Sequence, residues 1–331
     1  MSATVFSRIG VIGAGAWGTA LALAATRAGR EVMLWSRDSE TSSTIRATGM
    51  APRLHGIRLP ASITPTADLA ALADCRAFIL AVPTQVQREV IEAMALVLAA
   101  GKPVISAAKG IERSTGQFVT EVILDAWPGA VPAILSGPSF AEDVGRGLPT
   151  AVTLAAGDAF LAQALAEALS SPAFRIYHSA DLRGVEIGGA TKNVLAIAAG
   201  ISIGLGFGES ARAALVARGF AEIRRFGAAF GAQGDTLMGL SGLGDLVLTC
   251  GSTQSRNFAF GKALGEGKSV AEASGGKLAE GAFTAQVLVT MARARGIDMP
   301  IAAGIDDVVA GRAQVRDAVA GLLARPVRSE S

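Results

Sequence analysis

"GVIGAGAWGTALA", residues 10–22, holds three glycines in the order G-x-G-x-x-G near the start of the chain. An apolar run typical of a strand, residues 8–13, leads into the motif, and a helical stretch over residues 17–28 follows it. A second β-rich run, "EVMLW", begins at residue 31. Within a strand–helix–strand unit of about 30 residues, this motif is typical of a turn that binds the phosphates of a dinucleotide.

Each glycine of the motif has its own expected task. Gly13 permits a tight turn, Gly15 lets the backbone approach a pyrophosphate, and Gly18 lets the helix pack closely on the strand. The free N–H groups of the first helical turn would then face the anion. A glycine-rich turn without a ligand is the alternative, because the motif by itself is not specific.

The rest of the chain divides into two regions with different sequence patterns. Further strand candidates occur at 77–82, 103–108, 130–135 and 150–156, with helical segments such as 84–100 between most of them. Strands that alternate with helices predict an α/β fold, a Rossmann-type doubly wound sheet that is mostly parallel and covered on both faces. From about residue 184 the spacing is helical throughout. We therefore predict a dinucleotide-binding domain over residues 1–185 and an all-helical substrate and catalytic domain over residues 186–331.

Composition restricts the class of protein further. The net charge of +2 is too small for a broad basic surface that binds nucleic acid. Two cysteines and two histidines match no metal or redox spacing, so we expect no metal and a reducing compartment. The first strand begins within ten residues of Met1, which predicts a cytoplasmic protein without a signal peptide. Residues 193–208 are free of charge but shorter than the ~20 residues of a membrane span, so we expect a buried helix there.

The loop after the second strand, "WSRDS" at residues 35–39, is where such folds read the adenine ribose. Ser36 and Arg37 are suited to a 2′-phosphate, whereas Asp38 lies one residue late for the carboxylate that favours a 2′-hydroxyl. This pattern favours NADPH, with NADH as the alternative. Arg37 as an ordinary solvated loop residue is the competing interpretation.

Six motifs then occur in one order: "GAGAWGTALA", "AAKGIE" (107–112), "LSGPSFAEDV" (135–144), "GGATKNVLAIAAG" (188–200), "GLSGLGDLVLTC" (239–250) and "SRN" (255–257). Together they resemble the bacterial NAD(P)-dependent sn-glycerol-3-phosphate dehydrogenases over roughly residues 8–320. The resemblance implies reduction of dihydroxyacetone phosphate to sn-glycerol 3-phosphate for phospholipid synthesis, by a homodimer with a small phosphorylated substrate and no stable membrane insertion. One stretch departs from the family pattern: "GMAPRLHGIRLP" (49–60) lacks the Asn and the Tyr-Leu pair that relatives usually carry before "LP".

Lys192 stands in an otherwise apolar helical stretch, where a lysine is seldom tolerated without a function. Desolvation lowers the pKa of an amine, which suits a lysine to donate and accept a proton near neutral pH. Gly188 and Gly189, one turn earlier, are expected to leave room for substrate or nicotinamide. The resemblance implies that Lys192 exchanges the proton as hydride passes between the nicotinamide and C2 of the substrate. A lysine that snorkels at a helix end is the alternative.

Four further residues complete the expected catalytic set. Lys109 ends a strand-like run, and the carboxyl ends of parallel strands face the ligand crevice. The resemblance implies that Asp245 orients Lys192, that Thr249 adds a hydroxyl, and that Asn193 contacts substrate oxygens or positions the lysine. Their alternatives are an exposed strand-end lysine for Lys109 and a helix cap for Asp245.

"SRN" offers a guanidinium fork in Arg256, an amide in Asn257 and a hydroxyl in Ser255, which suit a phosphate. Gly137 and Ser139 lie between a strand and a helix, where small residues and free N–H groups suit an oxyanion. The expected substrate-binding residues are Lys109, Gly137, Ser139, Lys192, Asp245, Ser255, Arg256 and Asn257.

Several positions are expected to contact the cofactor, partly from the fingerprint and partly from the resemblance. The expected cofactor-binding residues are Gly13, Gly15, Ala16, Trp17, Gly18, Ser36, Arg37, Lys109, Ala141, Arg256, Leu278 and Glu280. Core packing for Trp17 and an ordinary surface carboxylate for Glu280 are the alternatives.

Two other functions stay open at this level. One is a two-domain dehydrogenase that reduces a carboxylate-bearing substrate, such as a β-hydroxy acid or a ketopantoate-like compound, since Arg256 suits either anion. The other is a dinucleotide-sensing module without catalysis, which has no need for Lys192 and Asp245.

Overall fold

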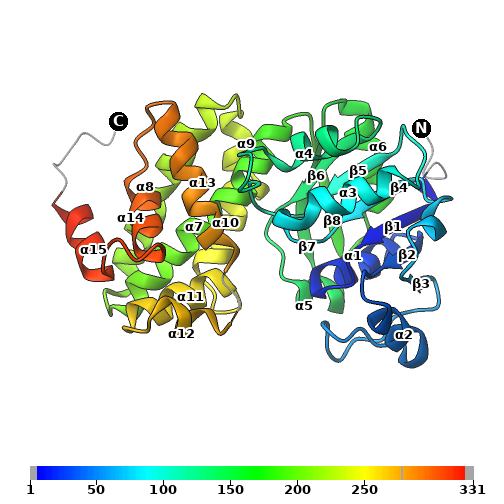
Figure 1. The fold of residues 1–331 in the computed structure, drawn as a ribbon, viewed down its shortest axis with the longest axis horizontal. Coiled ribbons are helices and arrows are strands. Elements are labelled where there is room, and N and C mark those ends of the chain that lie inside the picture. The colour runs from blue at the N-terminus through cyan, green and yellow to red at the C-terminus, as the bar shows by residue number, and fades with distance from the viewer. Residues whose placement is uncertain (1–5, 277–278, 325–331) are drawn as a thin grey trace. The chain divides into compact units, whose positions relative to one another are not determined.

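The structure, a computed structural model, describes residues 6–276 and 279–324. The chain forms two compact units (Figure 1). Unit 1 comprises Met1–Gly189 and Asp235–Asp245, and unit 2 comprises Ala190–Gly234 and Leu246–Ser331. The helix α7 and the helix α10 each begin in unit 1 and end in unit 2 along the chain.

Unit 1 is built on one sheet of eight strands with helices between them (Figure 1). Its strands are β1 (Arg8–Ile12), β2 (Glu31–Trp35), β3 (Ile63–Thr66), β4 (Ala77–Leu80), β5 (Pro103–Ser106), β6 (Val131–Ser136), β7 (Thr150–Ala156) and β8 (Phe174–Ser179). Its helices before residue 182 are α1 (Ala16–Arg27), α2 (Ser39–Thr48), η2 (Ala70–Leu72), η3 (Thr84–Val86), α3 (Gln87–Ala95), α4 (Val119–Ala126), α5 (Ala141–Arg146) and α6 (Ala159–Leu169).

The strand order is β3-β2-β1-β4-β5-β6-β7-β8, and every pair is parallel except β6 with β7. Its first six strands have the order 3-2-1-4-5-6 of a doubly wound dinucleotide-binding sheet. The predicted Rossmann-type fold is confirmed. Strands β3 and β8 were not predicted from the sequence; β3 carries Pro65 at the sheet edge, where proline is tolerated.

Successive side chains along the strands belong to two different apolar cores. Ile9 and Val11 of β1 pack in one apolar cluster with α1, α5 and α6, whereas Ile12 packs in another with α3 and α4. In β4, Ile79 joins the first cluster and Phe78 the second. Because successive strand residues point to opposite faces, both faces of the sheet must be covered.

The loop that departs from the family pattern packs on α5. Met50 and Arg58 form an isolated antiparallel bridge, and Leu54 is only 1% exposed. A Cβ on Gly145 of α5 would lie 2.8 Å from the side chain of Ile57 and 2.9 Å from that of Leu54. This loop therefore contributes apolar contacts to the core of unit 1.

Beyond residue 181 the described residues form helices and no strand, as predicted. These helices are α7 (Leu182–Gly204), α8 (Gly208–Ala229), α9 (Gly234–Met238), the π-helix η4 (Leu240–Gly244), α10 (Asp245–Cys250), α11 (Arg256–Gly265), α12 (Val270–Ser274), α13 (Glu280–Ala294), α14 (Pro300–Val309) and α15 (Val315–Leu323). Among the described residues only α7 is long and apolar enough to cross a membrane, and 89% of its most apolar window is buried inside the protein. Such burial is typical of a core helix, and it confirms the expected buried helix over residues 193–204. Residues 205–207 instead form a turn before α8, with Phe207 49% exposed.

In unit 2, the backbones of α7 and α11 touch where the two helices cross. A Cβ on Gly200 of α7 would lie 2.1 Å from the carbonyl oxygen of Phe258, and one on Gly261 of α11 would lie 2.0 Å from that of Ile197. Any side chain at either glycine would push the two helices apart. The glycines therefore fix the distance between the helix that carries Lys192 and the helix that carries Arg256.

Candidate active site

The β1–α1 turn has the geometry expected of a phosphate-binding turn. Gly13 has a φ of +113°, and its N–H donates to the carbonyl oxygen of Trp35 at 2.9 Å. A Cβ on Gly18 would lie 1.8 Å from the Gly13 carbonyl oxygen, so only glycine permits this packing. A Cβ on Gly15 would meet nothing within 4 Å, and no side chain caps α1. Open space therefore adjoins the turn where the helix N–H groups begin.

Ala16 and Trp17, the first residues of α1, pack on the core cluster of unit 1 while remaining partly exposed. Ala141, the first residue of α5, packs on the same cluster. All three positions thus have a structural role whether or not they also contact a cofactor.

The three polar residues in the loop after β2 have different environments. Ser36 is buried and its N–H donates to the Thr66 carbonyl oxygen at 3.0 Å. The Asp38 carboxylate caps α2, and the hydrogen bond from the Thr41 hydroxyl lowers its pKa. The Arg37 side chain is 71% exposed, with Glu89 at 3.7 Å. Asp38 is therefore engaged in helix capping, while the Arg37 guanidinium faces solvent.

Lys109 follows β5 and forms a partly buried ion pair with Asp245. Its Nζ donates to Asp245 Oδ2 at 2.6 Å and to the Gly137 carbonyl oxygen at 2.9 Å. The two side chains are 13% and 1% exposed. The Ser139 hydroxyl donates to the same Gly137 carbonyl at 3.0 Å. The structure thus brings four predicted residues together at the carboxyl ends of the central strands, where ligands bind in such sheets.

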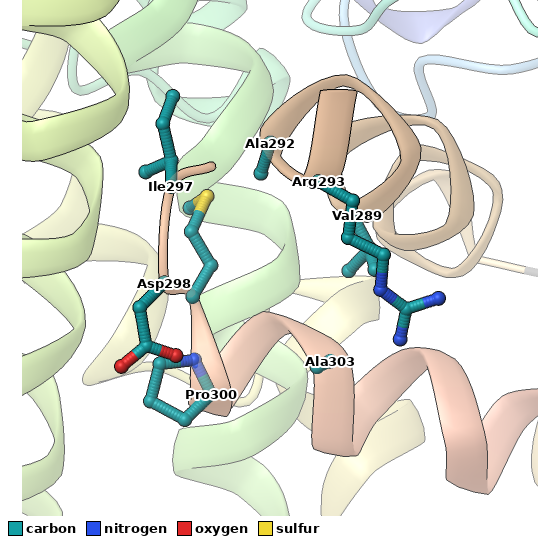
Figure 2. A pocket seen from close by; sticks show the side chains of 8 residues that line it. Val289, Ala292, Arg293, Ile297, Asp298, Pro300 and Ala303 are labelled. Carbon is teal, nitrogen blue, oxygen red and sulfur yellow. The ribbon is translucent and has the colours of Figure 1, made fainter. Parts of the chain in front are cut away.

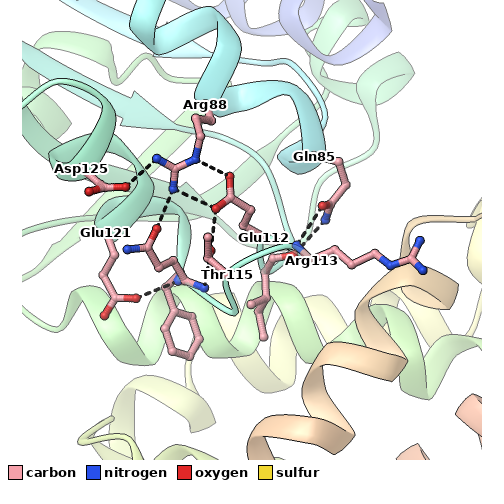
Figure 3. Close-up of polar contacts among 10 residues, drawn as sticks. Gln85, Arg88, Glu112, Arg113, Thr115, Glu121 and Asp125 are labelled. Carbon is pink, nitrogen blue, oxygen red and sulfur yellow. Dashed lines mark hydrogen bonds and ion pairs between the residues drawn. The ribbon is translucent and has the colours of Figure 1, made fainter.

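An ion-pair network holds the loop that Lys109 begins (Figure 3). Arg88 of α3 donates to both oxygens of Glu112 at 3.0 and 2.9 Å, and its third nitrogen lies 2.5 Å from Asp125. The Arg88 guanidinium lowers the pKa of the Glu112 carboxyl. Gln85 donates to the Ile111 carbonyl oxygen at 2.9 Å. The sequence motif "AAKGIE" contains Glu112, three residues after Lys109, and this position was the available signal for it.

The space beside Gly188 and Gly189 is filled by protein. A Cβ on Gly188 would lie 2.6 Å from the Ser241 carbonyl oxygen, and one on Gly189 would lie 2.6 Å from Ser136 Oγ. The expectation that these glycines admit substrate or nicotinamide is therefore wrong. They are small because α7 packs against β6 and the π-helix without room for side chains.

In unit 2, Lys192 is buried on α7 with 7% of its surface exposed. Its Nζ donates to the hydroxyl of Thr249 at 2.8 Å, and Thr249 is 3% exposed. A buried amine thus meets a group that can both accept and donate a hydrogen bond.

Three residues of the "SRN" motif have three different environments. The Ser255 hydroxyl caps α11 by accepting from the Phe258 N–H at 3.2 Å. Arg256, the first residue of that helix, is exposed. Asn257 is buried and donates through Nδ2 to Asn193 Oδ1 at 3.0 Å. Glu280 begins α13, and the predicted Leu278 lies outside the described residues.

A small pocket of about 220 Å³ lies in unit 2 beside the start of α14 (Figure 2). This volume is below the roughly 300–1,000 Å³ of most ligand pockets. No predicted site residue lines it: its lining is Val289, Ala292, Arg293, Ile297, Asp298, Met299, Pro300 and Ala303.

The strand order, the glycine-rich turn after β1 and the alternation of strands and helices define a Rossmann-type nucleotide-binding fold. Two family models match the chain: the N-terminus of NAD-dependent glycerol-3-phosphate dehydrogenase over residues 8–162 and its C-terminus over residues 181–320. The chain belongs to the NAD-dependent glycerol-3-phosphate dehydrogenase family, as the motifs predicted.

Individual relatives are similar over the whole length. A protein named glycerol-3-phosphate dehydrogenase (NAD(P)+) from Azorhizobium caulinodans is 61% identical over 329 residues, covering 99% of this chain and 100% of its own. One of the same name from Methylobacterium radiotolerans is 58% identical, with 98% of each chain covered. The crystal structure of glycerol-3-phosphate dehydrogenase from Coxiella burnetii matches with a TM-score of 0.92 at 38% identity, covering 97% of this chain and 100% of that one.

Proposed function

We propose that this protein catalyses the reversible, NAD(P)H-dependent reduction of dihydroxyacetone phosphate to sn-glycerol 3-phosphate, and so supplies glycerophospholipid synthesis. The full-length similarity to proteins named for this reaction carries the proposal. Residues 1–185 serve as the dinucleotide-binding domain, and residues 186–331 supply the helical substrate and catalytic domain.

The β1–α1 turn suits the cofactor's pyrophosphate, because Gly15 adjoins open space and α1 has no side-chain cap. Gly13, Gly15, Ala16, Trp17 and Gly18 would hold it there. The nicotinamide, when bound, supplies the hydride. Ser36 and Arg37 receive the 2′-phosphate of NADPH, the preferred cofactor, and Ala141, Glu280 and Leu278 add further contacts.

Lys192 donates the proton that the developing alkoxide at C2 requires, and it takes the proton back in the reverse direction. The Thr249 hydroxyl holds Nζ at 2.8 Å through both protonation states, because it can accept from an ammonium and donate to an amine. Asp245 holds the Lys109 ammonium, so that a fixed positive charge faces the substrate.

The substrate's phosphate needs donors that stay in place. We assign this task to the exposed Arg256 fork, with Asn257 and Ser255 beside it. Asn193 contacts substrate oxygens, and Gly137 and Ser139 offer small, polar surroundings. Arg256 also reaches the cofactor, which couples phosphate binding to hydride transfer.

The direct test follows NADPH or NADH absorbance with dihydroxyacetone phosphate present. Turnover is expected with both cofactors, and folded protein without turnover would contradict the proposal. A panel of β-hydroxy acids and ketopantoate in the same assay distinguishes phosphate from carboxylate recognition. Dihydroxyacetone should react far less well than its phosphate, because binding energy of the phosphate is used in the transition state.

Lys192→Ala tests the proton-transfer role. We expect kcat to fall by at least about a hundredfold, because general acid–base catalysis is lost, while the Kd for NADPH stays the same. Lys262→Ala is the matched control, since that lysine of unit 2 is 41% exposed and pairs with Glu266 on the surface at 3.4 Å. Retained turnover in Lys192→Ala would remove the assignment.

We also propose a cytoplasmic homodimer. The family resemblance supports this assembly, and no described residue is assigned to the interface. Sedimentation of the purified protein should give about twice the chain mass of 33.5 kDa. A monomer at enzyme-assay concentrations would contradict it.

A further inference from the structure

Gly281 is the second residue of α13, where a backbone N–H has no acceptor within its own helix. Its N–H instead donates to Oδ1 of Asn257 at 2.8 Å. Gly281 is buried, so water does not replace this acceptor. A side chain of α11 therefore satisfies one of the free N–H groups at the start of α13.

This backbone donor determines how two amide side chains are turned. Because an N–H can only donate, the oxygen of Asn257 must face Gly281 and its Nδ2 must face away. That Nδ2 donates to Oδ1 of Asn193 at 3.0 Å, so the oxygen of Asn193 faces Asn257. Asn193 and Asn257 are 4% and 8% exposed. The orientation of both amides follows from the position of one backbone N–H.

The chain leaves no room for a side chain at residue 281. A Cβ there would lie 2.5 Å from the backbone oxygen of Asn193 and 2.8 Å from Oδ1 of Asn257. Ordinary contact would require shifts of roughly 1 Å. Because α7 and α11 already meet backbone to backbone at Gly200 and Gly261, the shift would fall on α13 or on the Asn257 side chain.

We propose that Gly281 is a positioning residue for substrate binding: its N–H and its missing side chain hold the amides of Asn257 and Asn193 in the orientation that receives the substrate. This inference rests on the proposed function, in which these two amides contact the phosphorylated substrate. Gly281 acts only through the two asparagines.

Gly281→Ala tests this role without removing any polar atom. We expect the KM for dihydroxyacetone phosphate to rise at least about tenfold, since displacement of binding groups by ~1 Å has large effects. The Kd for NADPH should change little, whereas the thermal midpoint should fall, because a methyl group is forced into a packed site. Gly304→Ala is the matched control, because a Cβ at that glycine of α14 would lie 3.8 Å from its nearest neighbour, Ala318, in ordinary contact. Its KM should equal that of the wild type.

An unchanged KM in folded Gly281→Ala would overturn the proposal. If that variant does not fold, hydrogen exchange of the Gly281 amide in the wild-type protein decides instead: slow exchange supports the asparagine acceptor, and exchange as fast as that of an uncapped first-turn amide overturns it. The two proposals can fail separately. Absence of turnover in the wild type and in Gly304→Ala contradicts the proposed function, while exchange of the Gly281 amide still tests the orientation of the asparagines.

Discussion

Lys109, in unit 1, and Lys192, in unit 2, donate to different kinds of group. Lys109 meets the carboxylate of Asp245, which keeps a positive charge in place, whereas Lys192 meets the hydroxyl of Thr249. A carboxylate partner offsets the cost of burying an ammonium, so Asp245 suits a lysine whose charge is constant. A hydroxyl can accept a hydrogen bond from an ammonium and donate one to a neutral amine. These partners are why we assign charge stabilisation to Lys109 and proton transfer to Lys192.

Arg37→Ala tests the cofactor preference at the scale of a single residue. We expect the ratio of kcat/KM for NADPH over NADH to fall at least about tenfold, because a charge-assisted contact to the 2′-phosphate is lost. Glu89→Gln is the matched control: it removes the negative charge 3.7 Å from Arg37 and leaves the guanidinium in place. An unchanged ratio in Arg37→Ala would show that another residue recognises the 2′-phosphate.

Among the elements, α14 begins with a cap supplied by another helix. Met299 gives no side-chain cap, and the N–H groups of Ile301 and Ala302 donate to the carboxylate of Glu222 on α8 at 2.8 and 3.3 Å. Glu222 is only 2% exposed, and burial raises the pKa of its carboxyl to about 7. A carboxylate at a helix N-terminus is favourable, but its desolvation opposes ionisation.

This raised pKa predicts how stability changes with pH. The folded protein binds the Glu222 proton more tightly than the unfolded chain does, so this contribution is fully present below about pH 4.5 and is lost as the pH rises through about 7. Glu222→Gln should therefore gain about 2 kcal/mol in free energy of unfolding, relative to the wild type, between pH 5 and pH 8. Urea unfolding at both pH values measures this difference. Glu209→Gln, on the same helix at a side chain that is 74% exposed, should show no such change; an equal change in both variants would contradict the assignment.

For the whole molecule, all three tryptophans, Trp17, Trp35 and Trp127, lie in unit 1, whereas helices occur in both units. Tryptophan fluorescence therefore reports the unfolding of unit 1, and far-UV circular dichroism reports both units. The proposed cofactor turn also belongs to unit 1. A ligand that binds only the folded state stabilises it by mass action.

NADPH should consequently raise the free energy of unfolding seen by tryptophan fluorescence. At about a hundred times its Kd we expect a gain of about 2.7 kcal/mol, measured by urea unfolding. Sodium chloride at the same ionic strength is the control for screening. Equal unfolding curves with and without NADPH would contradict cofactor binding at the β1–α1 turn.

Local sequence patterns were sufficient for much of the fold. Strand periodicity, helix spacing and the glycine motif predicted six strands and the helical second half, because each depends on residues close along the chain. β3 and β8 were missed, since a four-residue strand with Pro65 and a half-exposed edge strand give weak signals. The antiparallel pairing of β7 with β6 was also not predictable, because parallel and antiparallel strands can have the same local pattern.

By itself the sequence determined the Rossmann-type sheet, its glycine-rich turn, the helical second half and the family, because these depend on local periodicity and on ordered motifs. Only the tertiary structure decided which polar groups meet: Lys109 and Asp245 are 136 residues apart in the chain, and Asn193 and Asn257 are 64 apart. It also showed that Gly188 and Gly189 make room for protein rather than for a ligand. The physical reason is that such contacts depend on how buried backbones pack at ångström distances, which no local pattern along the chain records.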